Sequence, residues 1–542
     1  MTDHTLHPQH VPGGPLTDVA LQKTLSRALH GAKCALHPID GTLWASVTPQ
    51  TMLESCLALH AMGGVFDSAF TYPLKGKQWA VAYVFRLDQG GRAEGRLIVL
   101  YAQGQSFYAV SGKIHSALWD ERKMHELNGR VFAMLEDTRP IIAHPENAVW
   151  DTKSPRKGAA SKAAFPPHAP APKYEFSGTG EEGEFEIPVG PVHAGIIEPG
   201  HFRFFVSGEG INKLEARLSY MHRGIEALAV GKKMSDCFPL IEQVSGDESV
   251  ANSIAFAQAA ESLCGIQVPA RAQSLRLILA EQERLTSHLA DLGGIAMDVG
   301  FSASSSQFAA CRESMMRLNE KCFESRFLRK MIKIGGLQWD PQPERISALL
   351  AGLAQFSITL GEIERFSLAS STFLDRAFMA GQLTAHTSAN LAIVGPGARA
   401  SGISCDARKH LAYGAYKSVS FNESMGSKGD ALSRFMVKLS EIKESVRLIQ
   451  NETSRMQPGP VCSSATPLPK SGAIALGVSE AARGSVTMFL QAGKGGTISY
   501  LGIKTASFRN WRALEQAIHG NIVADFPLIN KSFNLSYAGA DL

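Results

Sequence analysis

Hydrophobic residues follow one period before a proline-rich stretch of the chain and another period after it. Before it, the apolar runs WAVAYVFRL (79–87) and GRLIVLYA (95–102) are separated by DQGGRAE, and SFYAVSG follows them. Runs of this length, bounded by glycine, predict a β-hairpin and a third strand. TMLESCLALHAMGG (51–64) predicts a helix that ends at glycine. We therefore expect a small α+β domain over residues 1–150.

The proline-rich stretch is the clearest boundary in the chain. DTKSPRKGAASKAAFPPHAPAPK (151–173) consists largely of Pro, Ala, Lys and Ser and offers almost no large side chain to bury. This composition predicts a linker over 151–180, extended where prolines dominate.

Beyond the linker, in residues 181–542, apolar side chains recur mainly at helical spacing. One long amphipathic helix is marked by Leu275, Ile278, Leu285, Leu289 and Leu292, and a second by Ile211, Leu214, Leu218, Met221, Ile225 and Leu228. Further helices are expected at 305–333, 343–372 and 429–456, with strands within 186–210 and 486–504. The expected fold is α+β: a small α+β domain, a linker, and a larger, mainly α domain with a small β portion.

Composition narrows the class of protein. A chain of 542 residues is too long for a single hydrophobic core. Its 54 basic and 50 acidic side chains nearly balance, so the net charge gives no reason to expect a nucleic-acid-binding protein. The apolar run 346–361 is shorter than a membrane span, so we expect a buried helix there and membrane association through partners. The N-terminus lacks the pattern of a secretory signal, and the eight cysteines form no CxxC pair, as in a reduced cytoplasmic protein.

Several strings occur together in the order of one superfamily. They are GPVHAGIIEPGHFRF (190–204), HRGIEALA (222–229), ERLTSHLADLGG (283–294), GPGARASGISCDAR (395–408) and VADFPLI (523–529). They resemble the large subunit of group 4, energy-converting nickel–iron hydrogenases, which is homologous to the 49-kDa subunit of respiratory complex I. ALWDERKMHELNGR (117–130) resembles the signature of the 30-kDa subunit of complex I, which is fused ahead of the large subunit in formate-hydrogenlyase-type enzymes.

The resemblance implies that a metal site has been lost. In active hydrogenases of this superfamily, two CxxC pairs hold nickel and iron. Here EQVSGDESVANS places Ser245 and Glu248 at the first pair of cysteine positions, and NLSYAGAD places Ser536 and Gly539 at the second pair. Soft thiolates are the ligands that such a centre requires, and neither hydroxyls nor glycine replace them. We expect no metal in this chain.

The resemblance also suggests where an acceptor would bind. In complex I the vacated cavity takes a quinone headgroup, which a tyrosine and a histidine contact. The tyrosine position falls on Gly246, whereas His193 and His201 match the histidine string. The quinone site is therefore incomplete by this alignment.

The remaining candidates have a functional and a structural interpretation. His193, Glu198 and His201 either line the old pocket or are satisfied structural groups. The family's equivalent of Arg399 points into the cavity. Asp247, Glu248 and Asp406 are the carboxylates expected to neutralise this arginine there, or to lie in solvent-facing ion pairs. His222 and Arg223 either approach the iron–sulfur partner or make a boundary contact, and Glu281, Arg284 and His288 are expected to brace one helix face.

Two functions follow from the resemblance. The first is an NADH-quinone-oxidoreductase-like subunit that passes electrons from a neighbouring iron–sulfur subunit to a quinone-like or other small acceptor, coupled to ion translocation. The second is a non-catalytic coupling or scaffold subunit of the same complex. An active hydrogenase is the least favoured alternative, because the ligands are missing. Either would be a hetero-oligomer with an iron–sulfur small subunit and antiporter-like and anchoring membrane-arm subunits, peripheral on the cytoplasmic face of the inner membrane. Iron–sulfur clusters would lie in the partners, and a quinone is the candidate ligand.

Overall fold

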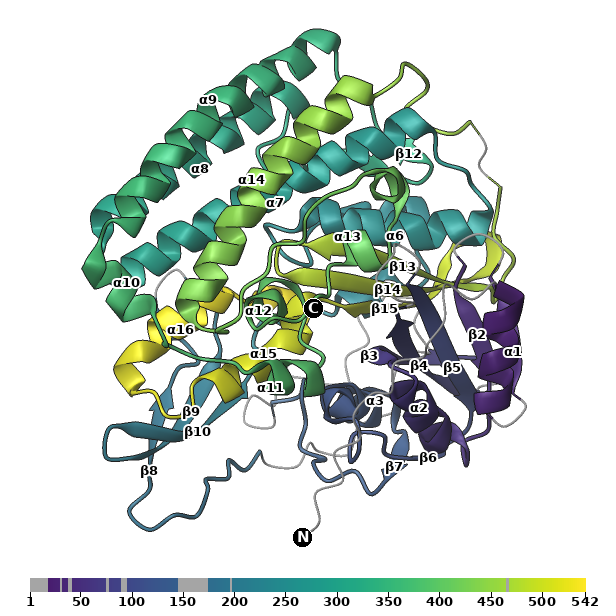
Figure 1. The fold of residues 1–542 in the computed structure, drawn as a ribbon. Coiled ribbons are helices and arrows are strands. Elements are labelled where there is room, and N and C mark those ends of the chain that lie inside the picture. Colours follow the sequence, from purple (N-terminus) through teal and green to yellow (C-terminus); the bar gives the residue numbers. More distant parts are fainter. Residues whose placement is uncertain are drawn as a thin grey trace, which may run out of the picture.

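The computed structural model describes residues 18–29, 32–37, 41–74, 78–88, 95–144, 174–194, 197–464 and 467–542. Residues 151–173 of the expected linker, 151–180, lie outside these residues, and 174–180 form no helix or strand, so this boundary stays a prediction. Helices and strands both occur on each side of it, in a mixed α+β architecture (Figure 1).

The N-terminal part is built on a five-stranded sheet with the order β1-β2-β5-β4-β3. β4 and β5 form the expected antiparallel hairpin, and β2 joins β5 in parallel. The predicted helix is present as α2. The elements are α1 (Asp18–Ala28), β1 (Lys33–Leu36), β2 (Leu43–Ser46), α2 (Met52–Ala61), β3 (Val65–Pro73), β4 (Trp79–Leu87), β5 (Arg96–Gln103), β6 (Ser106–Tyr108), α3 (Leu118–Asn128) and β7 (Val131–Ala133).

A second sheet packs against the first. It has the order β13 (Ile474–Ala481), β14 (Gly484–Ala492) and β15 (Ile498–Lys504), all antiparallel. One apolar cluster contains Phe70 and Val84 from the first sheet together with Leu476 and Phe489 from the second. α6 (Ser249–Cys264) packs on β13 and β14. The two parts of the chain therefore share a core.

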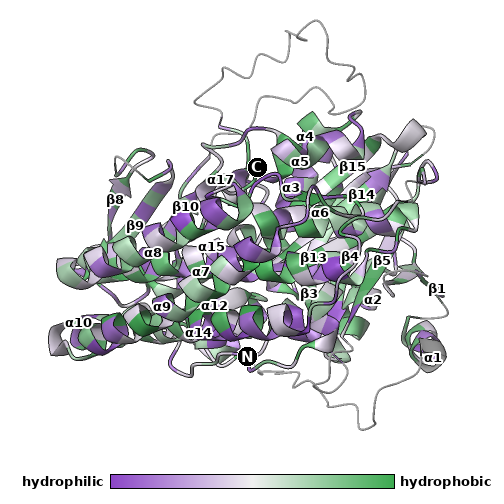
Figure 2. Ribbon diagram, turned by 90° about the horizontal axis from the view of Figure 1, so that it is seen from above, coloured by the Kyte–Doolittle hydropathy of each residue, from purple (hydrophilic) through white to green (hydrophobic). Residues whose placement is uncertain are grey.

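Long helices form a layer at one side of the molecule (Figure 1). α7 (Ala270–Asp298) packs along both α8 (Ser302–Phe323) and α14 (Ala431–Arg455), and α9 (Pro343–Leu368) packs along α8. These confirm the helices expected from apolar spacing, except that 324–333 contains turns and the short strand β11 (Ile332–Lys333). Figure 2 shows polar and apolar residues mixed along these helices.

The prediction that residues 346–361 form a buried helix holds for one face of α9 only. Leu349, Leu353 and Phe356 are buried, whereas Ala351 and Ile358 are exposed. Among the described residues, α9 alone is long and apolar enough to cross a membrane, and 33% of its apolar window is buried. The core helix of a soluble protein meets the same criterion.

The helix predicted over Ile211–Leu228 is wrong. β10 (Gly210–Arg217) pairs with β9 (His201–Ser207), which pairs with β8 (Phe185–Val189), and only Ile225–Ala229 is helical, as α4. Pairing with β9 outweighs the local pattern, and Ser219 at φ 71° turns the chain after the strand.

Shorter elements connect these layers. They are α5 (Phe238–Ile241), β12 (Gly336–Leu337), α10 (Ser371–Ala377), α11 (Ala385–Asn390), α12 (Gly395–Ala400), α13 (Ala407–His410), α15 (Ala506–Ala517), α16 (Phe526–Phe533) and α17 (Tyr537–Asp541).

Candidate functional site

The positions expected to have lost metal ligands lie together. The Ser245 hydroxyl, on the loop before α6, donates to the Ser536 hydroxyl at 3.1 Å, and Ser536 Oγ also accepts from the Gly539 amide at 2.9 Å. A Cβ placed on Gly539 would lie 3.5 Å from Cβ of Ser245. Residues distant by almost 300 positions therefore meet where the sequence comparison placed one site.

Arg483 lies beside these positions and was not predicted. It belongs to the turn between β13 and β14, and its side chain is 6% exposed. Its guanidinium donates to both Asp247 oxygens, at 2.9 and 2.7 Å, and lies 3.3 Å from Glu248 Oε1. It also donates to the backbone oxygen of Asn534, just before Ser536. One cation thus joins the loop before α6 to the C-terminal segment.

This charge sets the protonation of the neighbouring acids. Burial alone would raise the pKa of Asp247, but the Arg483 charge and hydrogen bonds hold it below its usual value. Burial raises the pKa of Glu248 despite Arg483, and the charge of Asp247 adds to this rise. Asp247 is 30% exposed and Glu248 only 1%, so the acid with the lowered pKa is the one nearer to solvent.

His193 and Glu198 lie against the same C-terminal segment. Glu198 Oε2 accepts from the Ala538 amide at 2.8 Å, and His193 Nε2 lies 3.4 Å from the Tyr537 hydroxyl. Burial lowers the pKa of His193 and raises that of Tyr537 to about 12.

His222 and Arg223 also hold this segment. His222 Nδ1 lies 2.7 Å from the backbone oxygen of Asp541, and Arg223 donates to that of Ala538 at 2.9 Å. The structural interpretation of this pair fits these contacts.

His201 belongs to a different environment. It begins β9, its Nδ1 lies 3.3 Å from the Gly190 carbonyl, and its ring packs on Phe176 with centroids 5.2 Å apart. Arg203 donates to its Nε2 at 3.3 Å. These contacts tie His201 to its own sheet, unlike His193, and do not bring it to Arg399.

Arg399 is fully buried in a separate ionic network. Its guanidinium lies 2.8 Å from Glu441, 2.9 Å from Glu480 and 3.7 Å from Asp406. A carboxylate from Asp247, Glu248 or Asp406 was expected within hydrogen-bond reach of Arg399. The hydrogen-bonded acids are instead Glu441 and Glu480, and Asp406 lies beyond hydrogen-bond distance. The ion pairs that Arg399 makes within the described residues do not include the 245–248 loop, so the expected convergence on one cavity does not occur.

Other helices complete this network. Arg408 pairs with Asp406 at 2.6 Å and with Glu281 at 2.9 Å, and Arg284 lies 3.3 Å from Glu281. Tyr416 and Ser445 donate to Glu281, at 2.5 and 2.6 Å. Burial would raise the pKa of Glu281, yet Arg408 and Arg284 hold it below the usual value. The bracing expected for Glu281 and Arg284 is thus an ionic core that joins α7, α13 and α14.

Comparison with known proteins shows to which family this chain belongs. The sequence profile of "Respiratory-chain NADH dehydrogenase, 49 Kd subunit" matches residues 298–472. Formate hydrogenlyase subunit 5 of Escherichia coli (strain K12) is 30% identical over 468 residues, covering 85% of this chain and 82% of that protein. The chain belongs to this family of complex I 49-kDa subunits and group 4 hydrogenase large subunits.

Further relatives come from both branches of the family. Hydrogenase-4 component G of Escherichia coli (strain K12) is 30% identical over 442 residues, covering 81% of this chain and 76% of that protein. An NADH-quinone oxidoreductase subunit of Methylacidiphilum infernorum (isolate V4) is 28% identical over 393 residues, covering 68% and 94%. The family thus includes both hydrogenase and quinone-reductase subunits. Membership alone does not distinguish these two functions, so the side chains of the site have to be considered.

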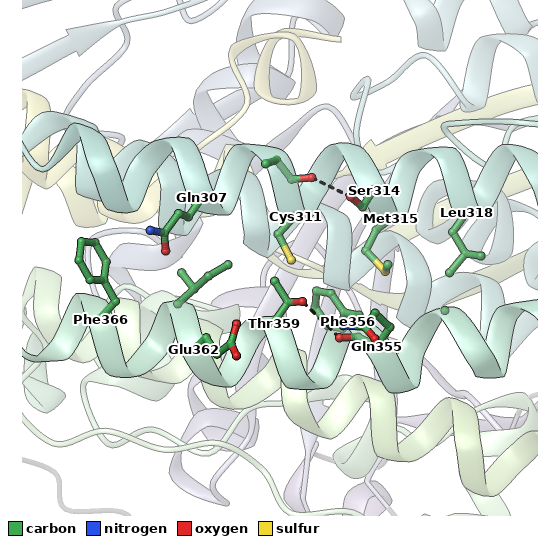
Figure 3. A pocket seen from close by; sticks show the side chains of 13 residues that line it. Gln307, Cys311, Ser314, Met315, Leu318, Gln355, Phe356, Thr359, Glu362 and Phe366 are labelled. Atoms are coloured by element: carbon green, nitrogen blue, oxygen red, sulfur yellow. Dashed lines mark hydrogen bonds between the residues drawn. The ribbon is translucent and has the colours of Figure 1, made fainter.

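Within the residues that the structure describes, no group of three or more His, Cys, Asp or Glu side chains is arranged to hold a metal ion. A cavity of about 660 Å³ lies elsewhere, as a groove between α8 and α9 (Figure 3). It is lined by Cys311, Met315, Phe356 and Phe366 among others, and contains none of the predicted site residues.

Proposed function

We propose that this chain is a metal-free coupling subunit of a membrane-bound, complex I-like assembly. Its family consists of components of multi-subunit enzymes, as the names of its relatives state, which supports a hetero-oligomer. The partners would be an iron–sulfur subunit, which carries the electrons, and membrane-arm subunits. The chain itself would lie at the cytoplasmic face without spanning the membrane.

The position of Arg483 is the main observation in support of a chain without nickel. Its guanidinium lies beside the four former ligand positions and is neutralised by Asp247 and Glu248. Both oxygens of Asp247 accept hydrogen bonds from Arg483, so this carboxylate is already engaged and is not free to bind a metal ion. Two hydroxyls and a glycine also offer no soft thiolate for nickel or low-valent iron. The charge that a metal would supply is here supplied by an arginine.

Contacts of helix α3 support the fused arrangement. In the string that resembles the 30-kDa signature, Asp120 pairs with Lys504 at 2.8 Å and Lys123 pairs with Glu226 at 2.9 Å. Both partners belong to the second part of the chain. Signature residues that hold the two parts together are what a fusion of adjacent subunits requires.

A second candidate is electron transfer to a quinone-like acceptor within this subunit. Tyr537 and His193 bring a phenol and an imidazole to 3.4 Å, close to the former metal positions. The alignment left the tyrosine position empty at Gly246, and Tyr537 supplies this group from a different segment. The pair favours a carbonyl-binding site, because each group can donate a hydrogen bond.

Metal analysis of the purified intact complex tests the metal-free proposal. We expect far less than one nickel per chain and no hydrogen uptake with a viologen dye. Stoichiometric nickel would overturn the proposal.

Tyr537→Phe separates the two candidates. It removes one hydroxyl and should leave reduction of a soluble quinone analogue by the complex unchanged if the subunit only couples. Tyr108→Phe, at a half-exposed position, is the matched control. A tenfold loss in Tyr537→Phe alone would establish the quinone candidate, since this corresponds to about 1.4 kcal/mol of transition-state stabilisation.

A further inference from the structure

His288 on α7 lies fully buried between two carboxylates. Its Nε2 is 2.9 Å from Oε2 of Glu441 on α14, and its Nδ1 is 3.8 Å from Oδ2 of Asp291 on its own helix. Nδ1 has no hydrogen-bond partner within the part of the chain that the structure describes. An orphaned buried polar atom costs about 1–3 kcal/mol, so Nδ1 would gain from the approach of a partner.

The Asp291 side leads to the former metal positions. Asp291 pairs with Lys438 at 2.6 Å and accepts from the side-chain amide of Asn534. The backbone oxygen of Asn534 accepts from Arg483, whose partner Asp247 is 30% exposed. Polar contacts therefore connect His288 to a carboxylate at the surface.

The Glu441 side leads to the buried ionic network. Glu441 contacts Arg399 at 2.8 Å and lies 4.0 Å from Arg284. Through Arg399 it is joined to Glu480 and Asp406. Within the described residues, His288 is thus the ionisable side chain that touches Asp291 and Glu441 together, and so links two clusters built on different segments.

The charges around the ring decide where a proton can stay. Asp291 faces Lys438, and Glu441 faces Arg399 and Arg284. Burial alone would raise the pKa of each acid, but Lys438 for Asp291 and Arg399 for Glu441 hold both values well below the usual range. Both carboxylates are therefore held ionised, and the imidazole between them can carry its ring proton on either nitrogen.

We propose that His288 is a proton-transfer residue that carries protons between the cluster beside the former metal positions and the Arg399 network. A proton arriving at Asp291 moves to Nδ1, forming an N–H bond as the O–H bond breaks. The proton on Nε2 then passes to Glu441, and the ring is left as the other tautomer. The transfer moves one proton and no electron. Return of a proton from Glu441, or rotation of the ring, restores the first tautomer.

The approach of Nδ1 to Asp291 is the step that would gate this transfer. At 3.8 Å the two atoms are beyond a hydrogen bond, whereas the Glu441 contact is already formed. A shift of about 1 Å closes this gap. A subunit that couples two reactions needs a contact that can open and close, as this one would. In this respect the inference rests on the proposed function.

The charge state of His288 can be measured in the purified full chain without any assumption about function. With ¹⁵N-labelled histidine, ring shifts recorded between pH 5 and 9 report which nitrogens carry protons, and His288→Gln assigns the signal. We expect the ring to exchange between its two tautomers. Asp291→Asn should shift the exchange toward the tautomer protonated at Nε2. One fixed neutral tautomer at every pH, unchanged in Asp291→Asn, would overturn the proposal.

Turnover of the intact complex supplies a second test. His288→Gln should lower ion-coupled turnover at least tenfold and change its solvent deuterium isotope effect, while the complex still assembles. His125→Gln is the matched control, because the hydrogen bond that His125 makes among the described residues is to a backbone carbonyl, that of Arg130 at 2.8 Å, in the N-terminal part. Unchanged turnover and isotope effect in His288→Gln would reject the proposal. A complex inactive with every acceptor would count against the proposed function, and the histidine titration would still decide this inference.

Discussion

Arg483 binds Asp247 through two parallel hydrogen bonds, of 2.9 and 2.7 Å, across 236 positions of sequence. Bidentate arginine–carboxylate pairs are strong and directional, because both guanidinium donors match both oxygens. This pair fixes the loop before α6 to the β13–β14 turn, beside the segment that carries Ser536 and Gly539. The loop that carries Ser245 and Glu248, two of the positions expected to have lost metal ligands, is thereby held by an internal ion pair.

Arg483→Ala should destabilise the chain by about 3 kcal/mol, because it leaves Asp247 and Glu248 without their cation. Denaturant unfolding of the purified chain measures this. Arg317→Ala is the control, since Arg317 is 75% exposed and pairs with Glu313 on the surface. It should change the free energy of unfolding by less than about 0.5 kcal/mol. Equal effects in the two variants would show that the Arg483 pair does not hold the loop.

Glu283 predicts a pH dependence of stability. Burial raises its pKa to about 8, and the charges of Glu248 and Asp247 add to this effect. The folded chain therefore keeps a proton that the unfolded chain releases near the ordinary value of 4.5. The stabilisation is complete below pH 4.5 and is lost as pH rises toward 8, at up to about 1.4 kcal/mol per pH unit.

Glu283→Gln isolates this effect. The amide cannot accept both backbone N–H bonds that Glu283 receives from Val250 and Ala251, so the variant has a constant penalty. Its unfolding free energy, however, should decline less steeply than that of the natural chain between pH 5 and 8. Parallel curves for the two proteins would contradict the raised pKa.

The contact between the two parts of the chain predicts how cleavage behaves. Lys504 pairs with Asp120 at 2.8 Å, and Arg509 pairs with Asp67 at 3.0 Å, across a shared apolar core. A protease that cuts within 151–173 should leave two fragments that elute together in size-exclusion chromatography. Lys504→Glu places a like charge beside Asp120 and should make the fragments separate after cleavage. Lys470→Glu, at an exposed position, should not.

The sequence predicted those elements whose local pattern and tertiary environment agree. The β4–β5 hairpin and the helix marked by Leu275 and Leu289 are examples, because one buried face defines each of them. Ile211 and Leu214 fit a helix equally well, yet their segment pairs with β9, and this pairing depends on residues that no local window contains. Long-range backbone pairing is why that prediction failed.

The site was predictable where a motif marks a position and unpredictable where only geometry does. Ser245, Glu248, Ser536 and Gly539 were expected to lie in one site because the family's cysteine motif marks these positions, and the structure brings Ser245, Ser536 and Gly539 together. Arg483 has no such spacing; its only signal is an arginine at the tip of a two-residue hairpin, Ala481 pairing with Gly484. His288 was expected to brace a helix, and its one satisfied nitrogen agrees, but the unsatisfied nitrogen appears only in three dimensions.

Two glycines on α9 provide a matched test of packing beside the groove. A Cβ at Gly361 would meet nothing within 4 Å, whereas a Cβ at Gly352 would lie 2.5 Å from a methyl group of Leu318 on α8. Alanine in place of glycine stabilises an exposed helix interior by about 0.5–1 kcal/mol, so Gly361→Ala should raise the unfolding free energy by this amount. At Gly352 the same gain is opposed, because Leu318 must move into the groove or the helices must separate, and overpacking costs about 1–3 kcal/mol.

We therefore expect Gly352→Ala to be less stable than Gly361→Ala by at least about 1 kcal/mol in denaturant unfolding. Double substitution with Leu318→Ala should restore part of the difference, since the obstructing methyl groups are then gone. Equal stability of the two glycine variants would mean that α8 and α9 do not pack as closely as the structure has them.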